Sequence, residues 1–350
     1  MTGSFNIVGV MSGTSVDGLD LCYVSFYSNH INNYKIIKCE TVDYSDDLKV
    51  KLINIINFDK QKIKELDLKF GEFIGLSIKK FISKNKLDSP DLISSHGHTV
   101  FHQPNIGKTL QIGSGKVINK ITGIKTVNNF REQDVKLGGQ GAPLVPIGDK
   151  LLFNEYKYCL NLGGFVNISI KKDKNIYAYD ICALNTVLNH YAKKIGYDYD
   201  SDGDLSKKGK VITKLFNELN ELNYYKKQYP KSLGIEFVKE KIIPIINKYN
   251  LIEIDILATY VKHAANQISN NINSNEKVLL SGGGSYNRTL IKILKKDYNV
   301  NIFIPNDTII NYKECLIFAL IGYLKIKNKI NCLKIVTGAL KDHSSGDIYN

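Results

Sequence analysis

Three glycine-rich segments of the sequence are suited to approach a phosphate group, and the first of them also carries carboxylates. Residues 9–20 (GVMSGTSVDGLD) lie between two predicted strands and include hydroxyl side chains as well as Asp17 and Asp20. Glycine lets a backbone turn tightly, amide and hydroxyl donors suit phosphate oxygens, and one or two carboxylates can hold a hydrated Mg²⁺. We therefore expect a phosphate-binding hairpin in preference to a polar turn that caps itself. It is not a Walker A loop, because no Gly-Lys-Ser/Thr follows and no helix begins there.

The other two glycine-rich segments are residues 161–167 (NLGGFVN) and 281–287 (SGGGSYN). Residues 161–167 again lie between predicted strands. By pseudo-symmetry with residues 9–20 they form either a second phosphate-facing hairpin or an ordinary tight turn. The segment at residues 281–287 lies between a buried strand and a helix, where backbone N–H groups and the helix dipole meet a nucleotide. Its adjacent glycines predict a nucleotide-binding turn.

Polar side chains gather in two further segments of the first half. Residues 94–99 (SSHGHT) and His102 bring imidazoles together, but their spacing resembles neither HExxH nor a tetrahedral Cys/His site. We expect them to bind a polyhydroxylated substrate by hydrogen bonds. Residues 128–134 (NNFREQD) contain Arg131, whose guanidinium can donate two parallel hydrogen bonds, and the carboxylate of Asp134. They lie beside a glycine-rich stretch, residues 138–146. A surface ion pair on a loop is the alternative for that segment.

Two acidic segments stand out in the second half. Residues 179–185 (YDICALN) place Asp180 at the end of a predicted short strand and Asn185 at the start of a helix. Such a carboxylate can accept a proton from a hydroxyl or water that attacks a phosphate or a strained acetal, or it can cap the helix. Residues 199–204 (YDSDGD) resemble part of a calcium loop but lack its later glutamate, so a helix-capping acidic turn is favoured.

Hydrophobic periodicity predicts an α/β protein in which one strand-and-helix scheme occurs twice. In the first half the predicted strands are residues 5–10, 21–27, 34–39, 92–94 and 125–128, and the predicted helices are residues 48–57, 63–85 and 115–122. In the second half the strands are residues 158–162, 166–170, 176–179 and 277–280, and the helices are residues 184–194, 235–248, 254–271 and 312–327. The scheme restarts near residues 130–151, which suggests two related domains, residues 1–130 and 131–350.

Composition narrows the function classes. The 350 residues are 43% hydrophobic and 23% charged, as in a soluble globular enzyme. The longest apolar run, residues 316–324, is far shorter than the roughly 20 residues of a membrane span, and residues 1–10 do not resemble a secretory signal. The net charge of +13 suggests a protein that binds nucleic acid. Against this, Arg131 and Arg288 are the only arginines, and no nucleic-acid-binding motif accompanies the lysines. Six widely spaced cysteines indicate neither a disulfide framework nor a structural metal. We expect a cytoplasmic protein that binds neither nucleic acid nor membrane.

Taken together, these segments resemble the anhydro-N-acetylmuramic acid kinase family along nearly the entire chain. The matching stretches, in the family's order, are residues 9–20, 95–104 (SHGHTVFHQP), 130–146 (FREQDVKLGGQGAPLVP), 161–169 (NLGGFVNIS), 199–211, 230–234 (PKSLG), 280–290 (LSGGGSYNRTL) and 336–339 (VTGA). The family is similar to the actin, hexokinase and acetate-kinase superfamily. The resemblance implies two duplicated ribonuclease-H-like domains around a nucleotide cleft. Dimerisation is expected from the resemblance alone.

The resemblance also implies an activity and the residues that perform it. Members use ATP and Mg²⁺ to cleave the 1,6-anhydro bridge of an amino sugar with water while phosphorylating its 6-hydroxyl, in peptidoglycan recycling. Asp180 matches the family's catalytic base. The residues that the resemblance assigns to ATP are Gly13, Thr14, Ser15, Val16, Asp17, Gly18, Leu19, Asp20, Gly163, Gly164, Gly282, Gly283 and Gly284, with Asp17 and Asp20 also assigned to Mg²⁺. Those that it assigns to the sugar are His96, Thr99, Arg131, Asp134, Asn185 and Glu314.

Two departures from the family's pattern concern the sugar. The usual Asp-Thr-Gly-Pro-Gly-Asn is here Asp180-Ile-Cys-Ala-Leu-Asn185, so the glycines that let the backbone approach the sugar are gone. His98 stands where the family usually has Gln. Two alternatives therefore remain beside the family's reaction: a sugar kinase of the same fold with another substrate, and a catalytically silent sensor of a muropeptide sugar.

Overall fold

The computed structural model describes residues 3–13, 15–27 and 31–350, and their contacts divide the chain into two compact units. One unit consists of Met1–Phe153 together with Tyr312–Asn350, and the other is Asn154–Asn311. The C-terminal segment belongs to the first unit because its strand β13 (Asp347–Tyr349) pairs with β7 (Thr126–Asn128) of that unit. The predicted boundary between residues 130 and 131 therefore does not coincide with the division between these units.

Each unit is built on a sheet, and five strands of the first sheet have the same order and the same directions as the five strands of the second. The first sheet consists, in spatial order, of β3 (Tyr34–Val42), β2 (Leu19–Tyr27), β1 (Ser4–Ser12), β4 (Leu92–Ser95), β7 and β13. The second consists of β10 (Asn175–Ala183), β9 (Phe165–Lys172), β8 (Tyr158–Leu162), β11 (Val278–Ser281) and β12 (Ile302–Phe303). In both, an antiparallel meander is followed by two parallel strands. The predicted duplication is confirmed, and the fold is two ribonuclease-H-like domains.

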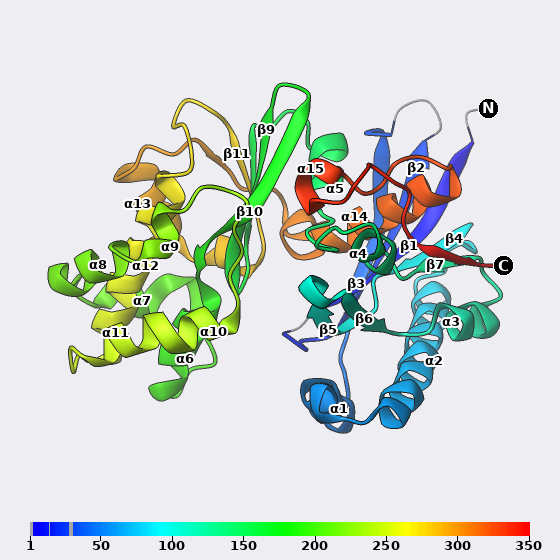
Figure 1. The fold of residues 1–350 in the computed structure, drawn as a ribbon, viewed down its shortest axis with the longest axis horizontal. Helices are drawn as coiled ribbons and strands as arrows, with labels where there is room; N and C mark the ends of the chain where they lie inside the picture. The colour runs from blue at the N-terminus through cyan, green and yellow to red at the C-terminus, as the bar shows by residue number, and fades with distance from the viewer. Residues whose placement is uncertain (1–2, 14, 28–30) are drawn as a thin grey trace. The chain divides into compact units, whose positions relative to one another are not determined.

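Helices pack on the sheet of the first unit. Their apolar residues recur at helical spacing, which gives each helix an apolar face to bury. The longest wholly within this unit, α2 (Lys60–Lys84), buries Ile63, Leu66, Phe70, Ile74 and Ile78 along one face, and α3 (Gly115–Thr122) packs beside it (Figure 1). The other elements of this unit are α1 (Asp46–Asn54), α4 (Glu132–Lys136), α5 (Pro146–Leu152), α15 (Lys334–Thr337), the short helices Ile55–Asn57 and Pro104–Ile106, and the hairpin of β5 (His98–Gln103) and β6 (Lys108–Ile112).

The last long helix, α14 (Asp307–Ile326), explains the apolar run at residues 316–324. Its residues from Cys315 to Ile321 are at most 1% exposed, so this stretch forms a buried core helix. It lies directly on β1, since a Cβ placed on Gly9 would be 2.2 Å from the Cys315 carbonyl oxygen. Within the described ranges, no helix combines the length and apolar character needed to cross a membrane.

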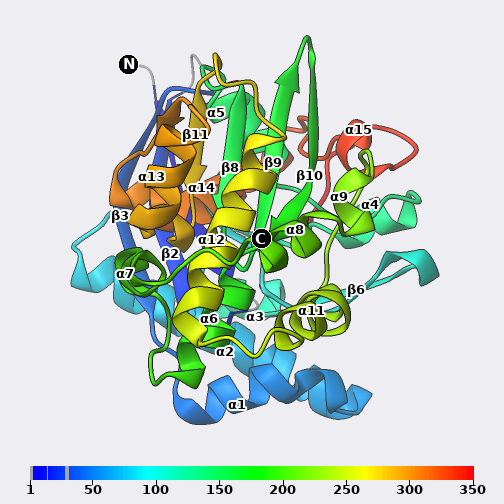
Figure 2. The same cartoon turned by 90° about the vertical axis from the view of Figure 1, so that its left-hand side faces the viewer.

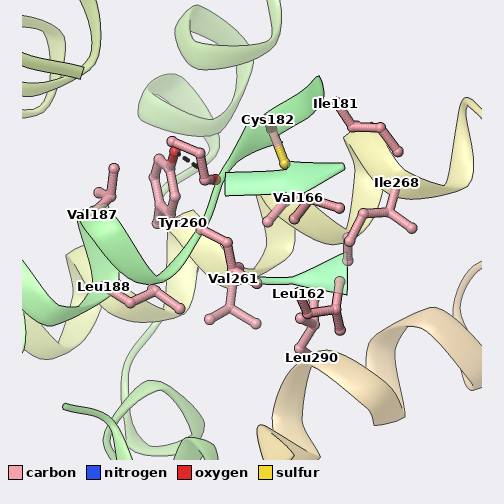
Figure 3. Close-up of a cluster of buried hydrophobic side chains, with 14 of the residues drawn as sticks. Leu162, Val166, Ile181, Cys182, Val187, Leu188, Tyr260, Val261, Ile268 and Leu290 are labelled. Carbon is pink, nitrogen blue, oxygen red and sulfur yellow. Dashed lines mark hydrogen bonds between the residues drawn. The ribbon is translucent and has the colours of Figure 1, made fainter. Parts of the chain in front are cut away.

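In the second unit, α12 (Glu253–Ser269) lies over one face of the sheet (Figure 2), and its buried side chains form part of the hydrophobic core. Figure 3 shows Tyr260 and Val261 of this helix among Leu162, Val166 and Cys182 of the strands. The remaining elements are α6 (Asn185–Lys194), α7 (Asp204–Lys208), α8 (Thr213–Asn220), α9 (Asn223–Lys226), α10 (Ile235–Phe237), α11 (Ile243–Asn247), α13 (Arg288–Lys296) and the short helices Ser201–Gly203 and Gly283–Tyr286.

One predicted helix has an irregular interior. The sequence predicts a single α-helix over residues 235–248, but Val238–Ile242 adopts π geometry between α10 and α11. Pro244 follows this segment and cannot donate an amide hydrogen to the preceding turn, which loosens the helical hydrogen bonding there.

Candidate functional site

The first glycine-rich segment forms the predicted hairpin. Strands β1 and β2 pair down to Ser12 and Leu19, and the turn between them is held by a 3.2 Å hydrogen bond from the Val16 amide to the Gly13 carbonyl. Val16 adopts a φ of 58°, which L side chains rarely do. Thr14, which the resemblance assigns to ATP, lies outside the described residues.

Carboxylates cluster at the β2 end of this hairpin. Burial raises the pKa of Asp20 to about 6; the Thr41 hydroxyl, which donates to Asp20 Oδ1 at 2.6 Å, opposes the rise, and the charges of Glu314 and Asp17 add to it. Asp17 itself is exposed. Negative charges held this close repel one another, and a divalent cation with oxygen ligands relieves that repulsion.

The imidazole of His96 is held as a neutral hydrogen-bonding group. Its Nδ1 lies 2.9 Å from the Gly97 carbonyl, to which it must donate, and its Nε2 accepts from Arg131 Nε at 2.9 Å. Burial, and then the charge of Arg131, keep the pKa of His96 well below its usual value. Arg131 also donates to the Gly141 carbonyl at 2.8 Å, so this side chain ties residues 94–99 to the loop after α4.

His98 belongs to a second network, which reaches the hairpin. Tyr44 donates to Ser12 Oγ at 2.8 Å, and Ser12 Oγ lies 3.0 Å from His98 Nδ1. Burial lowers the pKa of His98 to about 4, so this ring is neutral at pH 7. Thr99 is half-buried and His102 is exposed. Within residues 3–13, 15–27 and 31–350, these three histidines do not form a group with ligand atoms close enough to share a metal.

The interpretation of Arg131 and Asp134 as a surface ion pair is wrong. Asp134 is fully buried, and its carboxylate accepts hydrogen bonds from the Gly141 amide at 2.7 Å and from the Thr337 hydroxyl at 2.7 Å. These bonds connect the loop after α4 with the C-terminal segment. The assignment of Asp134 to the sugar stays a prediction, and in this structure its carboxylate has no exposed surface.

In the second unit, the turn at Gly163 and Gly164 is bound by the start of α6. The Gly164 carbonyl accepts from the amides of Leu184 at 2.8 Å and Thr186 at 3.2 Å, and the Gly163 carbonyl accepts from Asn185 at 3.3 Å. The side chain of Asn185 also donates to the Leu162 carbonyl at 3.3 Å. The two predicted segments, residues 161–167 and 179–185, are thus brought together.

The third glycine-rich turn packs on the same hairpin. Gly282 has a φ of +80°, and a Cβ on it would lie 2.3 Å from Asn161 Oδ1; a Cβ on Gly284 would lie 2.8 Å from atoms of Leu162 and Leu184. Among the described residues, nothing lies within 4 Å of the equivalent position on Gly283. Glycine is therefore required at two of these positions by packing, whereas Gly283 faces open space.

Beside this turn is a cavity of about 440 Å³ whose rim carries aromatic side chains. Gly283 and Gly284 contribute to its wall, together with Tyr199 and Tyr286, which are 60% and 37% exposed. Its other lining residues are Asn185, Leu188, Asn189, Asp200, Ser201, Asp202 and Asn287. Exposed tyrosine rings at the mouth of a cavity next to a glycine turn suit a planar base and its sugar.

Asp180 lies inside β10 and not at its end, because the strand continues to Ala183 past a register shift between Asp180 and Cys182. Its Oδ2 accepts from the Leu233 amide at 2.9 Å, and its own amide donates to the Lys231 carbonyl at 3.3 Å. The helix-cap alternative is wrong, since the N-cap of α6 is Leu184. Burial raises the pKa of Asp180, and the hydrogen bond from Leu233 opposes the rise. A carboxylate with a raised pKa is a better proton acceptor near neutral pH.

The departure from the family's pattern at residues 181–184 lies in the core. All four residues are at most 1% exposed, and Figure 3 shows Ile181 and Cys182 within the hydrophobic cluster. The Tyr260 hydroxyl donates to the Ala183 carbonyl at 3.1 Å. The four side chains pack against the hydrophobic cluster around α12.

The acidic turn at residues 199–204 is a helix cap, as the sequence predicts. The carboxylate of Asp200 accepts from the amides of Leu205 at 2.7 Å and Ser206 at 3.1 Å at the start of α7. Both oxygens of this carboxylate therefore accept hydrogen bonds from backbone amides.

Sequence analysis missed the residues that hold Asp180 and those that shape the cavity. Lys231 and Leu233 belong to the PKSLG stretch, which matches the family but suggests no role by itself. Tyr224, which donates to the Asp180 carbonyl at 2.6 Å, carries no pattern that would reveal it. Tyr199 and Tyr286 lie within residues 199–204 and 281–287, and their aromatic rings were the signal that could have revealed the cavity.

The chain is similar to known proteins over almost its full length. A family model described as "Anhydro-N-acetylmuramic acid kinase" matches residues 5–350. A Bacillus cereus (strain Q1) protein of that name is 31% identical over 98% of both chains, and a Bacillus anthracis protein of that name is 32% identical over 90% of this chain and 91% of its own.

Solved structures resemble it more distantly. Component A of the (R)-2-hydroxyglutaryl-CoA dehydratase of Acidaminococcus fermentans is 13% identical, with a TM-score of 0.48 over 92% of this chain and 99% of that one. A ROK family glucokinase from Streptomyces griseus, in complex with glucose and AMPPNP, is 11% identical, with a TM-score of 0.43 over 92% and 99%. Because the family model and the relatives both cover nine-tenths or more of the sequence, the chain belongs to the anhydro-N-acetylmuramic acid kinase family and is a kinase.

Proposed function

We propose that the protein uses ATP to open 1,6-anhydro-N-acetylmuramic acid with water and to phosphorylate O6, giving N-acetylmuramic acid 6-phosphate. The observation that carries this proposal is the environment of Asp180: a half-buried carboxylate of raised pKa, held by a loop amide, at the position of the family's base. The reaction belongs to peptidoglycan recycling, in the cytoplasm.

In the proposed step, Asp180 accepts a proton from a water molecule. The water oxygen bonds to the anomeric carbon, the bond from that carbon to O6 breaks, and O6 takes the γ-phosphoryl group while ADP leaves. Because Leu233 binds Oδ2 at 2.9 Å, the orientation of the carboxylate is fixed before the sugar arrives. Oδ1 is then the oxygen we assign to the proton.

ATP draws on donors that the glycine turns expose. We assign the adenosine to the 440 Å³ cavity beside Gly283, between the rings of Tyr199 and Tyr286. We assign the phosphates to the hairpin of residues 9–20, whose amides and Ser15 hydroxyl supply neutral donors, and to Gly163 and Gly164. Phosphoryl transfer depends mainly on positioning and on charge stabilisation, so a site rich in amides and poor in cations is sufficient when a metal accompanies the nucleotide.

The carboxylates of the first hairpin fit Mg²⁺. Asp20, whose pKa is raised to about 6 by burial and by neighbouring acids, stands close enough to Asp17 and Glu314 to feel both charges. We assign Asp17 and Asp20 to the ion, which when bound neutralises phosphate charge. Thr41 fixes the orientation of Asp20.

The sugar is assigned to the neutral imidazole of His96, the cation of Arg131, and Thr99, Asn185 and Glu314. Asp134, whose carboxylate has no exposed surface, contributes by holding the loop that carries Gly141. Of the residues assigned to the sugar, Arg131 and His96 already bind each other, which holds the guanidinium in one orientation. An immobilised cation suits the lactyl carboxylate of a muramic acid.

The decisive experiment incubates the protein with ATP, Mg²⁺ and 1,6-anhydro-N-acetylmuramic acid in H₂¹⁸O and analyses the products by mass spectrometry. We expect ADP and a product that has gained one phosphoryl group and one water whose oxygen carries the label. Phosphorylation of a different sugar, with none of this one, would support the altered-substrate kinase suggested by the departure at residues 181–184. Binding of the sugar without turnover would support the sensor.

A further inference from the structure

Three potential metal ligands that are far apart in the sequence meet in the interior of the first unit. Asp134, Cys332 and His343 each offer one ligand atom, and the three atoms lie within 4.8 Å of one another. Asp134 Oδ1 is 3.0 Å from Cys332 Sγ and 3.6 Å from His343 Nε2. All three residues are at most 6% exposed. The proposed reaction uses neither Cys332 nor His343.

The backbone holds two of these ligands in register. Cys332 and His343 form an antiparallel bridge in which the amide of each donates to the carbonyl of the other at 3.1 Å. Asp134 is fixed from the other side, because its Oδ2 accepts from the Gly141 amide at 2.7 Å. The side chains are therefore positioned by bonds that do not involve the three facing atoms.

The imidazole of His343 has the orientation that metal ligation requires. Its Nδ1 lies 3.1 Å from the Lys341 carbonyl, to which it donates, so Nε2 is the ring nitrogen available to a metal. A metal-bound histidine commonly donates its other ring N–H to a carbonyl in this way. Nε2 is buried and lacks a hydrogen-bond partner among the described residues, and it faces the Asp134 oxygen 3.6 Å away. A buried ring nitrogen without a hydrogen-bond partner is costly unless it binds something.

The spacing and chemistry favour zinc. Tetrahedral zinc, with bonds of about 2.0 to 2.3 Å, places its ligand atoms roughly 3.3 to 3.8 Å apart. The separation of 3.6 Å between Asp134 and His343 lies within this range, and the 3.0 Å between Asp134 and Cys332, which are now joined by a hydrogen bond, is slightly shorter. One sulfur, one nitrogen and one oxygen ligand suit Zn²⁺, whereas Mg²⁺ and Ca²⁺ prefer oxygen alone. Thr337 Oγ1, 2.7 Å from Asp134 Oδ1, offers a further oxygen for a fourth position.

We propose that Asp134, Cys332 and His343 form a zinc site that fastens the loop after α4 to the C-terminal segment. On binding, the Cys332 thiol, which donates to Asp134 Oδ1 in this structure, loses its proton to solvent and its sulfur bonds to the metal. When they bind the ion, a thiolate, a carboxylate and a neutral imidazole together carry two negative charges. These balance the two positive charges of Zn²⁺ at a buried site. None of the three ligands contacts the sugar in the proposed reaction, and the site serves the protein's stability.

The test uses the full-length protein, stripped of metal with a chelator and titrated with Co²⁺. We expect one equivalent to produce the near-ultraviolet band of a cobalt–thiolate bond, and one equivalent of Zn²⁺ to abolish it and to raise the melting temperature. Cys332→Ser should remove the band, and His343→Gln should weaken zinc binding by about tenfold or more. Cys159→Ser, which alters a buried thiol of the other unit, should leave the band intact.

Two results would overturn the proposal. One is a wild-type protein that shows no cobalt–thiolate band and no change in melting temperature at saturating Zn²⁺. The other is a band that persists in Cys332→Ser. Should Cys332→Ser fail to fold, alkylation of the wild type followed by mass spectrometry replaces it: zinc must slow modification of Cys332 and leave that of Cys159 unchanged, and equal rates at Cys332 with and without zinc would reject the site.

Discussion

The two glycine hairpins share a topology, yet each unit places its carboxylate on a different strand. Each hairpin has a second cross-strand residue pair, counted from the turn. Its member on the second strand is itself paired with a residue of the third strand. In the first unit this pair is Met11 and Asp20, and Asp20 stands opposite Thr41 on β3. In the second unit it is Asn161 and Asn167, and Asn167 stands opposite Asp180 on β10.

This difference shows how a duplicated scaffold divides its chemistry. Asp20 lies among other acids, and their charges add to the burial that raises its pKa to about 6, so it is suited to a cation. Asp180 has a raised pKa from burial alone, opposed by one amide donor, so it is suited to a proton. Neighbouring places in equivalent sheets thus suit a metal carboxylate in one unit and a base in the other because their surroundings differ.

The largest expected effect comes from Asp180→Asn. The amide keeps the hydrogen bond from Leu233 but accepts no proton, so kcat should fall by about 10²- to 10⁴-fold while ATP affinity is retained. Coupled-assay kinetics and nucleotide titration measure both quantities. Asp173→Asn, the same change at an exposed turn of the same meander, is the matched control. Unchanged turnover in Asp180→Asn would remove Asp180 from the role of base.

Asp20→Asn should act on the metal and leave the fold intact. Asparagine keeps an oxygen for Thr41 but loses the charge, and a charge-assisted contact is worth about 1.5 to 3 kcal/mol, so the Mg²⁺ concentration for half-maximal activity should rise roughly ten- to a hundredfold. The raised pKa of Asp20 means that folding disfavours its ionised form at pH 7, so the melting temperature should not fall. An unaltered Mg²⁺ dependence would show that Asp20 does not hold the metal.

Gly284→Ala should affect stability, whereas Gly283→Ala should not. A methyl group on Gly284 meets Leu162 and Leu184 at 2.8 Å, which should cost about 1 to 3 kcal/mol of unfolding free energy in chemical denaturation. A methyl group on Gly283 meets no described atom within 4 Å and should change stability by less than about 0.5 kcal/mol. Weaker ATP binding by the stable Gly283→Ala variant would support the adenosine cavity, and equal stability of the two variants would contradict this packing.

Tyr224→Phe is expected to have the smallest effect. It removes the hydroxyl that donates to the Asp180 carbonyl at 2.6 Å and should lower the unfolding free energy by about 0.5 to 1.5 kcal/mol. Because Leu233 still binds the carboxylate, kcat should change by less than about tenfold. A loss of turnover as large as that of Asp180→Asn would mean that the backbone at Asp180 is positioned by Tyr224 and not by the loop.

Much of the fold was predictable because it depends on local periodicity. The strands of both meanders and the long helices form where alternation and helical spacing placed them, since short-range patterns decide which face is apolar. Elements without such a pattern, including β12 and α9, were missed. The return of residues 312–350 to the first unit depends on pairing between β13 and β7, which are separated in the sequence by the whole of the second unit.

The candidate site divides in the same way. The sequence by itself determined where the tight turns lie and which hydroxyl and carboxylate side chains they carry, because glycine-rich stretches between apolar strands are local patterns. Only the tertiary structure decided their surroundings: that Asp134 is buried, that Asp180 is bound by Leu233, and that Cys332 and His343 meet. Burial and long-range hydrogen bonds set the pKa and orientation of a group, and these come from chain segments whose proximity no local pattern records.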